Sequence, residues 1–255
     1  MKKIITTTLV AIFTIALLSK CQSPQTQDDG FKVYEVAKTK KPIKIDSDWD
    51  KKQWKRVKPI EVTHFLRDRD IPAFIPRTQV KMVYDKDNLY VIFKVEDKYV
   101  RCITDRINGP VFRDSAVEFF FSPDVENPLN YFNLETNCGG TPLMQFHRNL
   151  DTGRESNRLA EEDIMMVEIV SSLPKIIDPE ITDNVTWTIE YRLPLALMKK
   201  YSTVTTPAKG VEWRGNFYKI ASITSNPHYI TWSKVDHRPN PNFHSPEVFG
   251  RLIFK

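Results

Sequence analysis

Short segments in which apolar and polar residues alternate follow one another along most of the chain. The clearest pair is Thr78 to Tyr84 and Leu89 to Val95, joined by the polar turn Asp85 to Asn88. Alternation with a period of two is typical of strands that bury one face, and a short polar turn between two such runs predicts a hairpin. Helical patterns are scarce. Besides a short turn near residue 50, only Leu195 to Tyr201 is expected to be helical, with Pro194 at its start.

Other segments also read as strands. They are Phe31 to Val36, Pro42 to Asp46, Ala116 to Phe121, Tyr131 to Thr136, Leu143 to His147, Met165 to Ser171, Val185 to Tyr191, Glu212 to Ser222, Tyr229 to Trp232 and Arg251 to Phe254. The charged stretch Asn149 to Asp163 is expected to be a mobile hairpin loop. This pattern predicts an all-β fold, an antiparallel β-sandwich of two sheets, jelly-roll or immunoglobulin-like, with one or two short helices.

The N-terminus has the features of a bacterial export signal. Lys2 and Lys3 precede an apolar run from about Leu9 to Leu18, which is too short to span a membrane. The run ends in Leu17-Leu18-Ser19-Lys20-Cys21, which resembles the lipobox of bacterial lipoproteins, in which the Cys is lipidated; Lys20 departs from the usual small residue. The alternative is a plain secretory signal in which Cys21 is incidental.

These features predict the domain organisation and location. Residues 1–20 are expected to be a signal peptide, residues 21–40 a lipidated Cys and linker, and residues 41–255 a single domain. The protein is then exported and lipid-anchored to a bacterial membrane, in the periplasm or on the cell surface. Removal of three lysines with the signal peptide lowers the formal charge from +5 to +2. Nucleic acid is therefore not an expected partner.

Few residues have metal-ligand spacing. Cys102 and Cys138 either form a disulfide after export or pack as free thiols, and the sequence does not decide between these alternatives. No zinc-ligand pattern is present, and no cofactor is expected. The alternating Asp46, Asp48 and Asp50 fit a helix cap better than a calcium loop, although a structural calcium ion remains open.

One predicted strand carries a carboxylate among large apolar residues. Glu118 lies within Ala-Val-Glu-Phe-Phe-Phe, from Ala116 to Phe121, a strand that is expected to bury most of its side chains. A buried carboxylate needs hydrogen-bond donors from the protein or from a ligand. Phe112 and Arg113, just upstream, are predicted to lie on an exposed loop that follows Gly109 and Pro110.

The chain ends with a loop rich in proline before its last strand. Pro239, Pro241 and Pro246 restrict the backbone around Asn240, Phe243 and His244. An aromatic ring flanked by amide, imidazole and carboxylate groups suits a sugar, because the ring stacks on C–H bonds while the polar groups bind hydroxyls. The alternative is that Phe243 is a hydrophobic plug beneath the loop.

Several of these segments together resemble the family 9 carbohydrate-binding modules and their lipoprotein relatives over roughly residues 41–255. The shared features are Ile45-Asp46 with Asp50 and Trp54, the hairpin Val80 to Asp97, the Gly109 to Pro123 stretch, Tyr131 to Asn137, Trp187 to Pro194 and Asn242 to Gly250. The resemblance implies a β-sandwich that binds sugar.

The resemblance also implies a set of ligand-binding residues. In binding members of the family, two aromatic rings hold a terminal sugar, while a Glu, amides and Arg residues bind its hydroxyls. Phe112 and Phe243 match the two aromatic positions, with Phe where Trp is usual. Glu118, Asn133 and Asn240 match further positions of that site. The sequence adds Arg113, Glu135 and His244 as candidate ligand-binding residues beside them.

Three functions follow from these observations. The leading hypothesis is non-catalytic carbohydrate binding by a lipoprotein associated with polysaccharide catabolism, with a saccharide or polysaccharide as its partner. The second is a glycoside hydrolase or its accessory module, in which Glu118 and Glu135 would be the carboxylates to test. No other hydrolase motif is apparent. The third is a haem-binding sandwich, by fold-level analogy.

Overall fold

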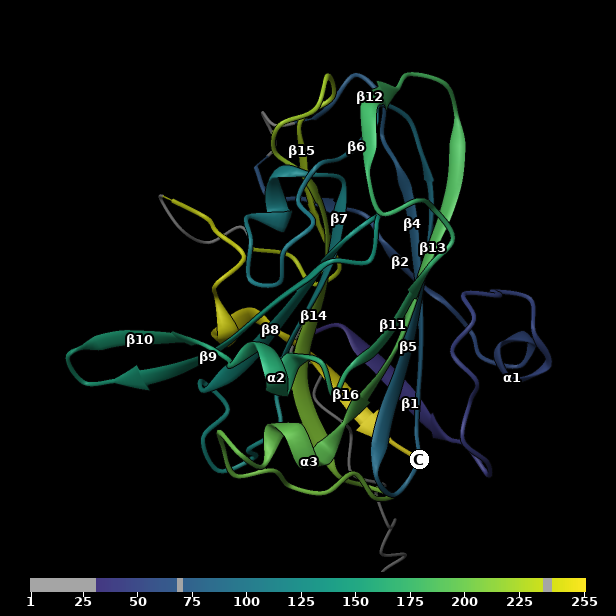
Figure 1. Ribbon diagram of the computed structural model, residues 1–255. Helices are drawn as coiled ribbons and strands as arrows, with labels where there is room; N and C mark the ends of the chain where they lie inside the picture. The colour runs from purple at the N-terminus through teal and green to yellow at the C-terminus, as the bar shows by residue number, and fades with distance from the viewer. Residues whose placement is uncertain (1–30, 68–70, 236–239) are drawn as a thin grey trace, which may run out of the picture. The chain divides into compact units, whose positions relative to one another are not determined.

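Two β-sheets face each other across an apolar core (Figure 1). The computed structural model describes residues 31–67, 71–235 and 240–255, and residues 31–255 form one compact unit. Cys21 and the predicted signal peptide lie outside the described residues. The fold is mostly β, as predicted for an all-β sandwich.

The first sheet carries the strands that matter most for the site. Its strand order is β10-β9-β8-β7-β14-β16-β1, with β15 beside β14 and β3 beside β15. Its strands are β1 (Val33–Lys38), β3 (His64–Phe65), β7 (Ala116–Ser122), β8 (Tyr131–Asn137), β9 (Pro142–Leu150), β10 (Gly153–Arg158), β14 (Glu212–Ala221), β15 (His228–Thr231) and β16 (Gly250–Phe254).

The second sheet has the order β1-β4-β5-β13-β11, with β2 beside β4. Its further strands are β2 (Ile60–Val62), β4 (Arg77–Tyr84), β5 (Asn88–Asp97), β11 (Glu168–Ser171) and β13 (Val185–Pro194). A separate two-stranded sheet pairs β6 (Val100–Cys102) with β12 (Ile177–Ile181). The predicted hairpin of Thr78 to Tyr84 and Leu89 to Val95 is confirmed as β4 and β5.

Strand β1 joins the two sheets. Its first residues, Val33 to Val36, pair in parallel with β16, and its last two, Ala37 and Lys38, pair in parallel with β4. The sandwich is therefore antiparallel except along this one strand. Because β1 occupies residues 33–38, the folded unit extends into residues 31–40, which the sequence assigned to a linker while also indicating a strand at Phe31 to Val36.

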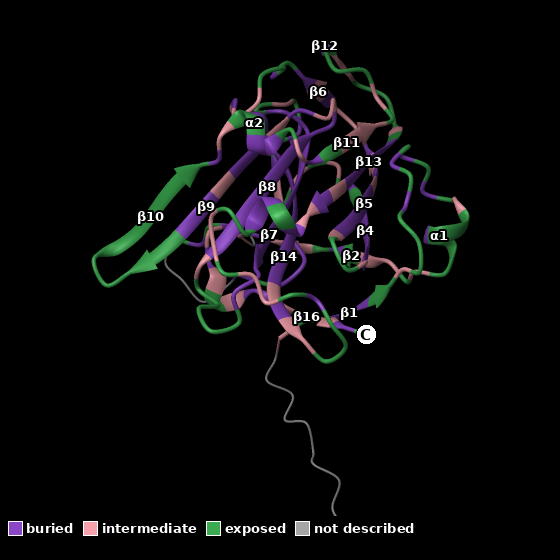
Figure 2. Cartoon of the chain, turned by 60° about the horizontal axis from the view of Figure 1, so that its bottom comes forward, coloured by how far each residue is buried: buried purple, intermediate pink, exposed green. Residues whose placement is uncertain are grey.

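The helices are short. They are α1 (Lys52–Lys55), α2 (Glu161–Ile164) and α3 (Leu195–Met198), with 3-10 turns η1 (Val111–Arg113) and η2 (Pro246–Val248). Among the residues described, none of these helices has the length and apolar character that a membrane crossing requires. The region predicted as a mobile hairpin loop, Asn149 to Asp163, contains the end of the β9–β10 hairpin and most of α2, so it has more regular structure than a loop. Figure 2 shows β10 exposed, whereas β7, β8 and β14 are buried.

Buried polar side chains also connect the two sheets. The ammonium group of Lys219, on β14, is fully buried and lies 3.2 Å from Asp97 on β5 and 2.8 Å from the His228 ring. The Trp187 indole donates a hydrogen bond to the same Asp97 carboxylate at 3.2 Å. Burial lowers the pKa of Lys219, and the Asp97 charge opposes that shift.

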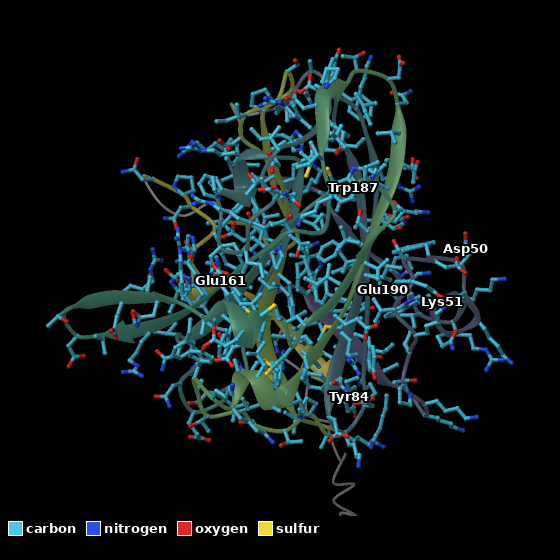
Figure 3. All side chains as sticks on the ribbon, in the orientation of Figure 1. Asp50, Lys51, Tyr84, Glu161, Trp187 and Glu190 are labelled. Atoms are coloured by element: carbon cyan, nitrogen blue, oxygen red, sulfur yellow. The ribbon has the colours of Figure 1, made fainter. Side chains whose placement is uncertain are left out.

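A buried carboxylate holds the segment before α1 against the second sheet. Glu190, on β13, accepts hydrogen bonds from the backbone amides of Asp46 and Ser47 and from the Trp54 indole, at 2.8–2.9 Å. Its Oε1 also lies 2.6 Å from the Lys51 ammonium, and the two side chains are neighbours in Figure 3. Residues Pro42 to Asp46 are therefore held by side-chain contacts and are not the strand predicted from sequence.

The Glu190 contacts predict a large loss of stability on truncation. Glu190→Ala should lower the free energy of unfolding by about 3–5 kcal/mol, because it leaves the buried Trp54 indole and Ser47 amide without their acceptor and removes one of the two carboxylates that pair with Lys51. Urea denaturation would measure it. The control is Glu168→Ala, which removes the exposed 3.2 Å pair with Arg192 and should lower stability by less than about 1 kcal/mol. Equal losses in the two variants would contradict this role.

Candidate functional site

Strand alternation directs two carboxylates onto the outer face of the first sheet. In β7, Val117, Phe119 and Phe121 belong to the core between the sheets, so Glu118 points to the opposite face. In β8, Phe132 and Leu134 face the core, and Glu135 points outward in the same way. Glu118 and Glu135 are direct cross-strand partners. Directly opposed residues have Cβ atoms only about 5 Å apart, so the two carboxyl groups are neighbours.

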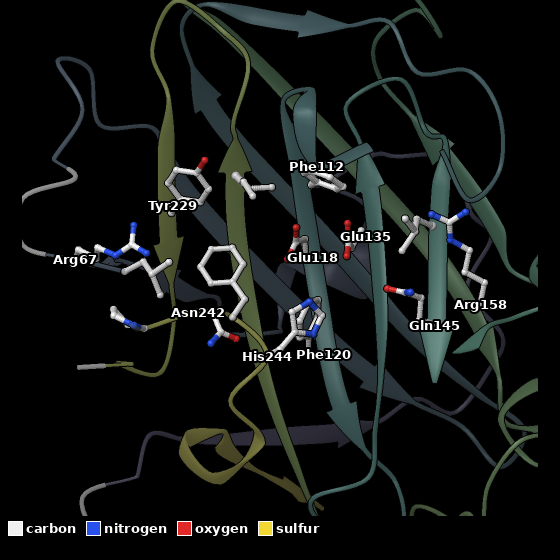
Figure 4. A pocket seen from close by; sticks show the side chains of 15 residues that line it. Arg67, Phe112, Glu118, Phe120, Glu135, Gln145, Arg158, Tyr229, Asn242 and His244 are labelled. Atoms are coloured by element: carbon white, nitrogen blue, oxygen red, sulfur yellow. The ribbon is translucent and has the colours of Figure 1, made fainter. Parts of the chain in front are cut away.

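A pocket of about 450 Å³ lies over this pair. In Figure 4, Glu118 and Glu135 lie side by side, with Phe112 on one side of the pair and His244 on the other. The residues that line the pocket are Leu66, Arg67, Phe112, Glu118, Phe120, Glu135, Leu143, Gln145, Arg158, Ile220, Tyr229, Pro241, Asn242, Phe243 and His244. A mostly apolar wall with a few convergent polar groups is the usual composition of a small-ligand site.

Both carboxyl groups at the floor are buried without full hydrogen bonding. The exposed fraction is 2% for Glu118 and 5% for Glu135, and the Oε2 atom of each has no hydrogen-bond partner. Burial raises the pKa of Glu135 to about 7. Burial also raises the pKa of Glu118 well above its usual value; the neighbouring Glu135 charge adds to this shift and Lys219 opposes it. The floor therefore holds protons that exposed glutamates would release.

A chain of hydrogen bonds orients Glu135. Asn133 donates through Nδ2 to Glu135 Oε1 at 2.8 Å, and its Oδ1 lies 3.0 Å from His147 Nε2. Because the Asn133 oxygen can only accept, His147 carries its proton on Nε2 and accepts at Nδ1 from the Ser156 hydroxyl, 2.7 Å away. Burial lowers the pKa of His147 to about 3, which keeps the ring neutral. Glu135 is thus held in one orientation, with Oε2 unpartnered.

Residues 240–249, the described part of the proline-rich loop before β16 and called the tail loop here, cover the other part of this outer face. Phe243 stacks on Tyr218 of β14, with ring centroids 4.1 Å apart and an interplanar angle of 22°. The Tyr218 hydroxyl donates to the Phe243 carbonyl at 2.9 Å, and the Ser245 hydroxyl donates to the Asn242 carbonyl at 2.9 Å. Only 7% of Phe243 is exposed. The Phe243 ring is therefore a plug beneath the loop that also contributes a wall of the pocket.

His244 adds an imidazole ring to the pocket lining. Its Nδ1 lies 2.8 Å from the Tyr131 hydroxyl, which accepts a hydrogen bond from Arg154 at 3.2 Å. Burial, with a smaller contribution from the Arg154 charge, lowers the pKa of His244 to about 4, so the ring is neutral near pH 7. Its second nitrogen, Nε2, is left for a polar contact with a ligand.

Phe112 supplies the accessible aromatic surface. It lies on η1, and 38% of its surface is exposed although its ring lines the pocket. The turn is fixed against β14, because the Ser222 amide donates to the Phe112 carbonyl at 3.3 Å and the Ile223 amide to the Arg113 carbonyl at 3.0 Å. A ring in this position offers a flat apolar face beside the carboxylates without any need for rearrangement.

The structure brings together five of the residues implicated by sequence. Phe112, Glu118, Glu135, Phe243 and His244 all line the pocket. Three others lie outside its lining. Arg113 is exposed on η1, Asn240 is exposed in the tail loop, and Asn133 is completely buried as the support of Glu135. Direct ligand contacts by these three are not supported by their positions.

Several lining residues were not identified from sequence. Arg67 and Tyr229 lie toward one end of the pocket and Gln145 and Arg158 toward the other, as Figure 4 shows. Gln145 could have been found, because it sits centrally in a predicted strand and shares a face with Leu143. Arg158 lies in the region predicted as a loop, and Arg67 and Asn242 lie in segments without a periodic pattern.

The aspartates considered for calcium serve as turn acceptors. Asp46 Oδ1 accepts from the Asp48 amide at 3.3 Å, and Asp48 Oδ1 accepts from the Asp50 amide at 2.9 Å. Across residues 31–67, 71–235 and 240–255, no group of three or more His, Cys, Asp or Glu side chains is arranged to hold a metal ion. Cys102 and Cys138 are both buried free thiols.

Comparison with known proteins identifies one family. The family model described as carbohydrate-binding family 9 matches residues 50–254. No curated protein matches the chain. Among solved structures, a candidate carbohydrate-binding protein from Bacteroides uniformis is 24% identical, with a TM-score of 0.74, over 88% of this chain and 100% of that one.

Two further structures show the same fold. Both are of a carbohydrate-binding module family 9 from Caldicellulosiruptor kristjanssonii, one in complex with glucose and one with cellotriose. Each is 16% identical, with a TM-score of 0.57, and covers 88% of this chain. The match spans 96% of the glucose-bound chain and 94% of the cellotriose-bound chain.

The raised pKa of Glu135 predicts a pH dependence of stability. Because the folded protein retains the Glu135 proton above the usual value of 4.5, this residue's contribution is greatest below pH 4.5 and is lost as pH rises to about 7. A shift of this size corresponds to about 3 kcal/mol. The difference in free energy of unfolding between Glu135→Gln and wild type should therefore be more favourable to the variant at pH 8 than at pH 5. Urea denaturation at the two pH values measures this difference.

The matched control for that measurement is an exposed glutamate of the same sheet. Glu155→Gln, on the exposed strand β10, should give the same change from wild type at pH 5 and at pH 8. If Glu135→Gln also changed stability equally at the two pH values, the carboxyl group would not be titrating as its burial requires.

Proposed function

The chain belongs to carbohydrate-binding family 9, and from this membership we propose that it binds a saccharide, without cleaving it, in the pocket over Glu118 and Glu135. The observation that carries the proposal is the combination, in one pocket, of an accessible aromatic ring with two neighbouring carboxyl groups. The glucose and cellotriose complexes of the Caldicellulosiruptor module support this class of ligand.

The pocket walls suit the two kinds of surface that a sugar presents. The C–H face of a pyranose ring stacks on Phe112, and His244 lies on the other side of the carboxyl pair (Figure 4), while Phe243 also lines the pocket. Hydroxyls at the ring edge then reach the Glu118 and Glu135 carboxyl groups and the His244 ring. Because Tyr218 covers one face of Phe243, the two aromatic walls are unequal, and Phe112 supplies most of the stacking.

A glycoside hydrolase is the second candidate, favoured by the paired carboxyl groups. Such enzymes use one protonated and one ionised carboxyl group, which flank the glycosidic bond. Here burial raises the pKa of both groups, and no cation of the described residues forms an ion pair with either one to keep it ionised. Carboxyl groups that stay protonated suit hydrogen bonding to a saccharide better than nucleophilic attack on a glycosidic bond. Release of reducing ends from a polysaccharide, lost in Glu118→Gln, would establish hydrolysis instead.

Phe112 provides the sharpest test of saccharide binding. Phe112→Ala should weaken affinity for cellotriose at least tenfold, because stacking is lost, while changing the melting temperature little, since the ring is 38% exposed. Isothermal titration calorimetry measures the affinity. Phe243→Ala is a less specific variant, because it also removes the stacked support of Tyr218.

A matched variant separates stacking from the general effect of removing exposed apolar surface. Leu129→Ala truncates a side chain of similar exposure, 40%, that does not line this pocket. It should leave saccharide affinity unchanged. If the unmodified protein bound none of a broad array of neutral and charged saccharides, the proposed function itself would be rejected.

The location of the protein is a further part of the proposal. Export and a lipid anchor at Cys21 are supported by the N-terminal sequence and would hold the domain at a bacterial membrane, at the cell surface or in the periplasm. Saccharide capture at that surface fits a role in polysaccharide catabolism. The linker after Cys21 would give the domain reach.

Lipid anchoring predicts a simple change in fractionation. Wild-type protein expressed in a bacterial host should incorporate labelled palmitate and sediment with membranes. Cys21→Ser should lose the label and release the protein into the soluble fraction, whereas Cys102→Ser, at a buried cysteine of the domain, should remain lipidated. An unlabelled wild-type protein would support the plain secretory signal instead.

A further inference from the structure

The two carboxyl groups at the floor of the pocket have no positively charged partner among the described residues. Glu118 and Glu135 are cross-strand neighbours, both are more than nine-tenths buried, and the Oε2 atom of each lacks a hydrogen-bond partner. Neither carboxyl group forms an ion pair within the described part of the chain. Ionising two buried, adjacent carboxyl groups costs free energy when no cation is near. A positively charged hydrogen-bond donor on a ligand would offset that cost.

The charged and titratable groups around the pair do not supply that complement. Lys219 projects from β14 into the core on the other side of the sheet, where it pairs with Asp97 at 3.2 Å. Arg158, at the end of β10, lines the pocket, and its charge partly opposes the rise in the Glu135 pKa, but it forms no ion pair with that carboxyl group and its side chain is exposed. Arg67 lines the far end of the pocket in Figure 4. The other polar groups nearby form hydrogen bonds with protein partners. They are the His147 and His244 rings, the Arg154 guanidinium and the Tyr131 and Tyr218 hydroxyls.

We propose that the preferred ligand of this pocket is an amino sugar whose protonated amine binds between Glu118 and Glu135. This inference rests on the proposed function and specifies its ligand class. A primary ammonium has three N–H donors, enough to bind both neighbouring carboxyl groups that line the pocket. A single hydroxyl has one donor and no charge, and it leaves the second carboxyl oxygen without a donor.

A metal ion fits the same floor less well. Calcium requires six to eight oxygen ligands, whereas the pair offers two carboxyl groups. Asn133, whose amide contacts Glu135, uses its oxygen for His147 and its nitrogen for Glu135. The remaining surroundings include Phe112, Phe120, Leu143 and Ile220, which pack against a carbon ring and cannot coordinate an ion. An ammonium carried on a sugar ring uses both the acidic floor and the apolar wall.

Binding of the amine displaces protons from the floor. In the free protein, burial keeps the pair protonated to a higher pH than in exposed glutamates. An ammonium between the two groups favours their ionised form, so the displaced protons leave to solvent and the ammonium keeps its own. The preference for the amine should therefore increase from pH 5.5 to pH 7, as the pair ionises more readily.

The test compares sugars that differ only at the amine. D-glucosamine and D-galactosamine are titrated into the mature protein by isothermal titration calorimetry at pH 7, against D-glucose, D-galactose and N-acetyl-D-glucosamine. At least one amine should bind tenfold or more tightly than its neutral parent, with proton release detected as a dependence on buffer ionisation enthalpy. The N-acetylated sugar, which has no charge, should show neither effect.

Variants assign the effect to the two carboxyl groups. Glu118→Gln and Glu135→Gln should each reduce the ratio of amine to neutral affinity toward one and lower the proton release, while Glu155→Gln on exposed β10 leaves both unchanged. Thermal melting of each variant verifies folding. The preference of wild-type protein for the amine is itself an independent measurement that needs no variant.

The outcomes distinguish this inference from the proposed function. If glucose or cellotriose binds and neither amine exceeds its parent, the amine preference is wrong while saccharide binding stands. If the amine preference survives in both Gln variants, the amine does not bind between these residues and the inference is overturned. If no saccharide of any kind binds, the proposed function fails, and this inference fails with it.

Discussion

The burial of two adjacent carboxyl groups is the constraint on which the site depends. Glu118 and Glu135 occupy opposed positions of neighbouring strands, so the register of β7 against β8 fixes their separation. The hydrogen-bond chain through Asn133 and His147 then orients one of them. A shift of one residue in either strand would send its carboxylate into the core. The chemistry of the pocket is therefore set by strand pairing.

The first sheet buries apolar side chains on both of its faces, and each face has a separate function. The inner face packs against the second sheet, where Phe217 of β14 meets Phe93 of β5 with ring centroids 6.0 Å apart. On the outer face, Phe120 and Tyr218 are covered by the tail loop through Phe243. Because the loop covers only part of that face, the remainder is open to a ligand. The tail loop thus completes the site as well as the apolar packing.

Local pattern accounted for most of the fold and for part of the site. The β4–β5 hairpin follows from alternation and a polar turn, and Glu118 was conspicuous because it interrupts a run of apolar residues. The pairing of Glu118 with Glu135 and the docking of Phe243 on Tyr218 are contacts between segments distant in sequence, which periodicity does not report. For the same reason Asn133 resembled a ligand-binding residue but is a buried support.

The central claim is that a saccharide binds over the carboxyl pair, and a crystal structure of the protein with a bound oligosaccharide tests it most directly. The predicted result is a sugar ring stacked on Phe112, with its polar substituents within hydrogen-bond distance of Glu118 and Glu135. A sugar bound elsewhere on the domain, with the pocket over these residues vacant, would contradict the account.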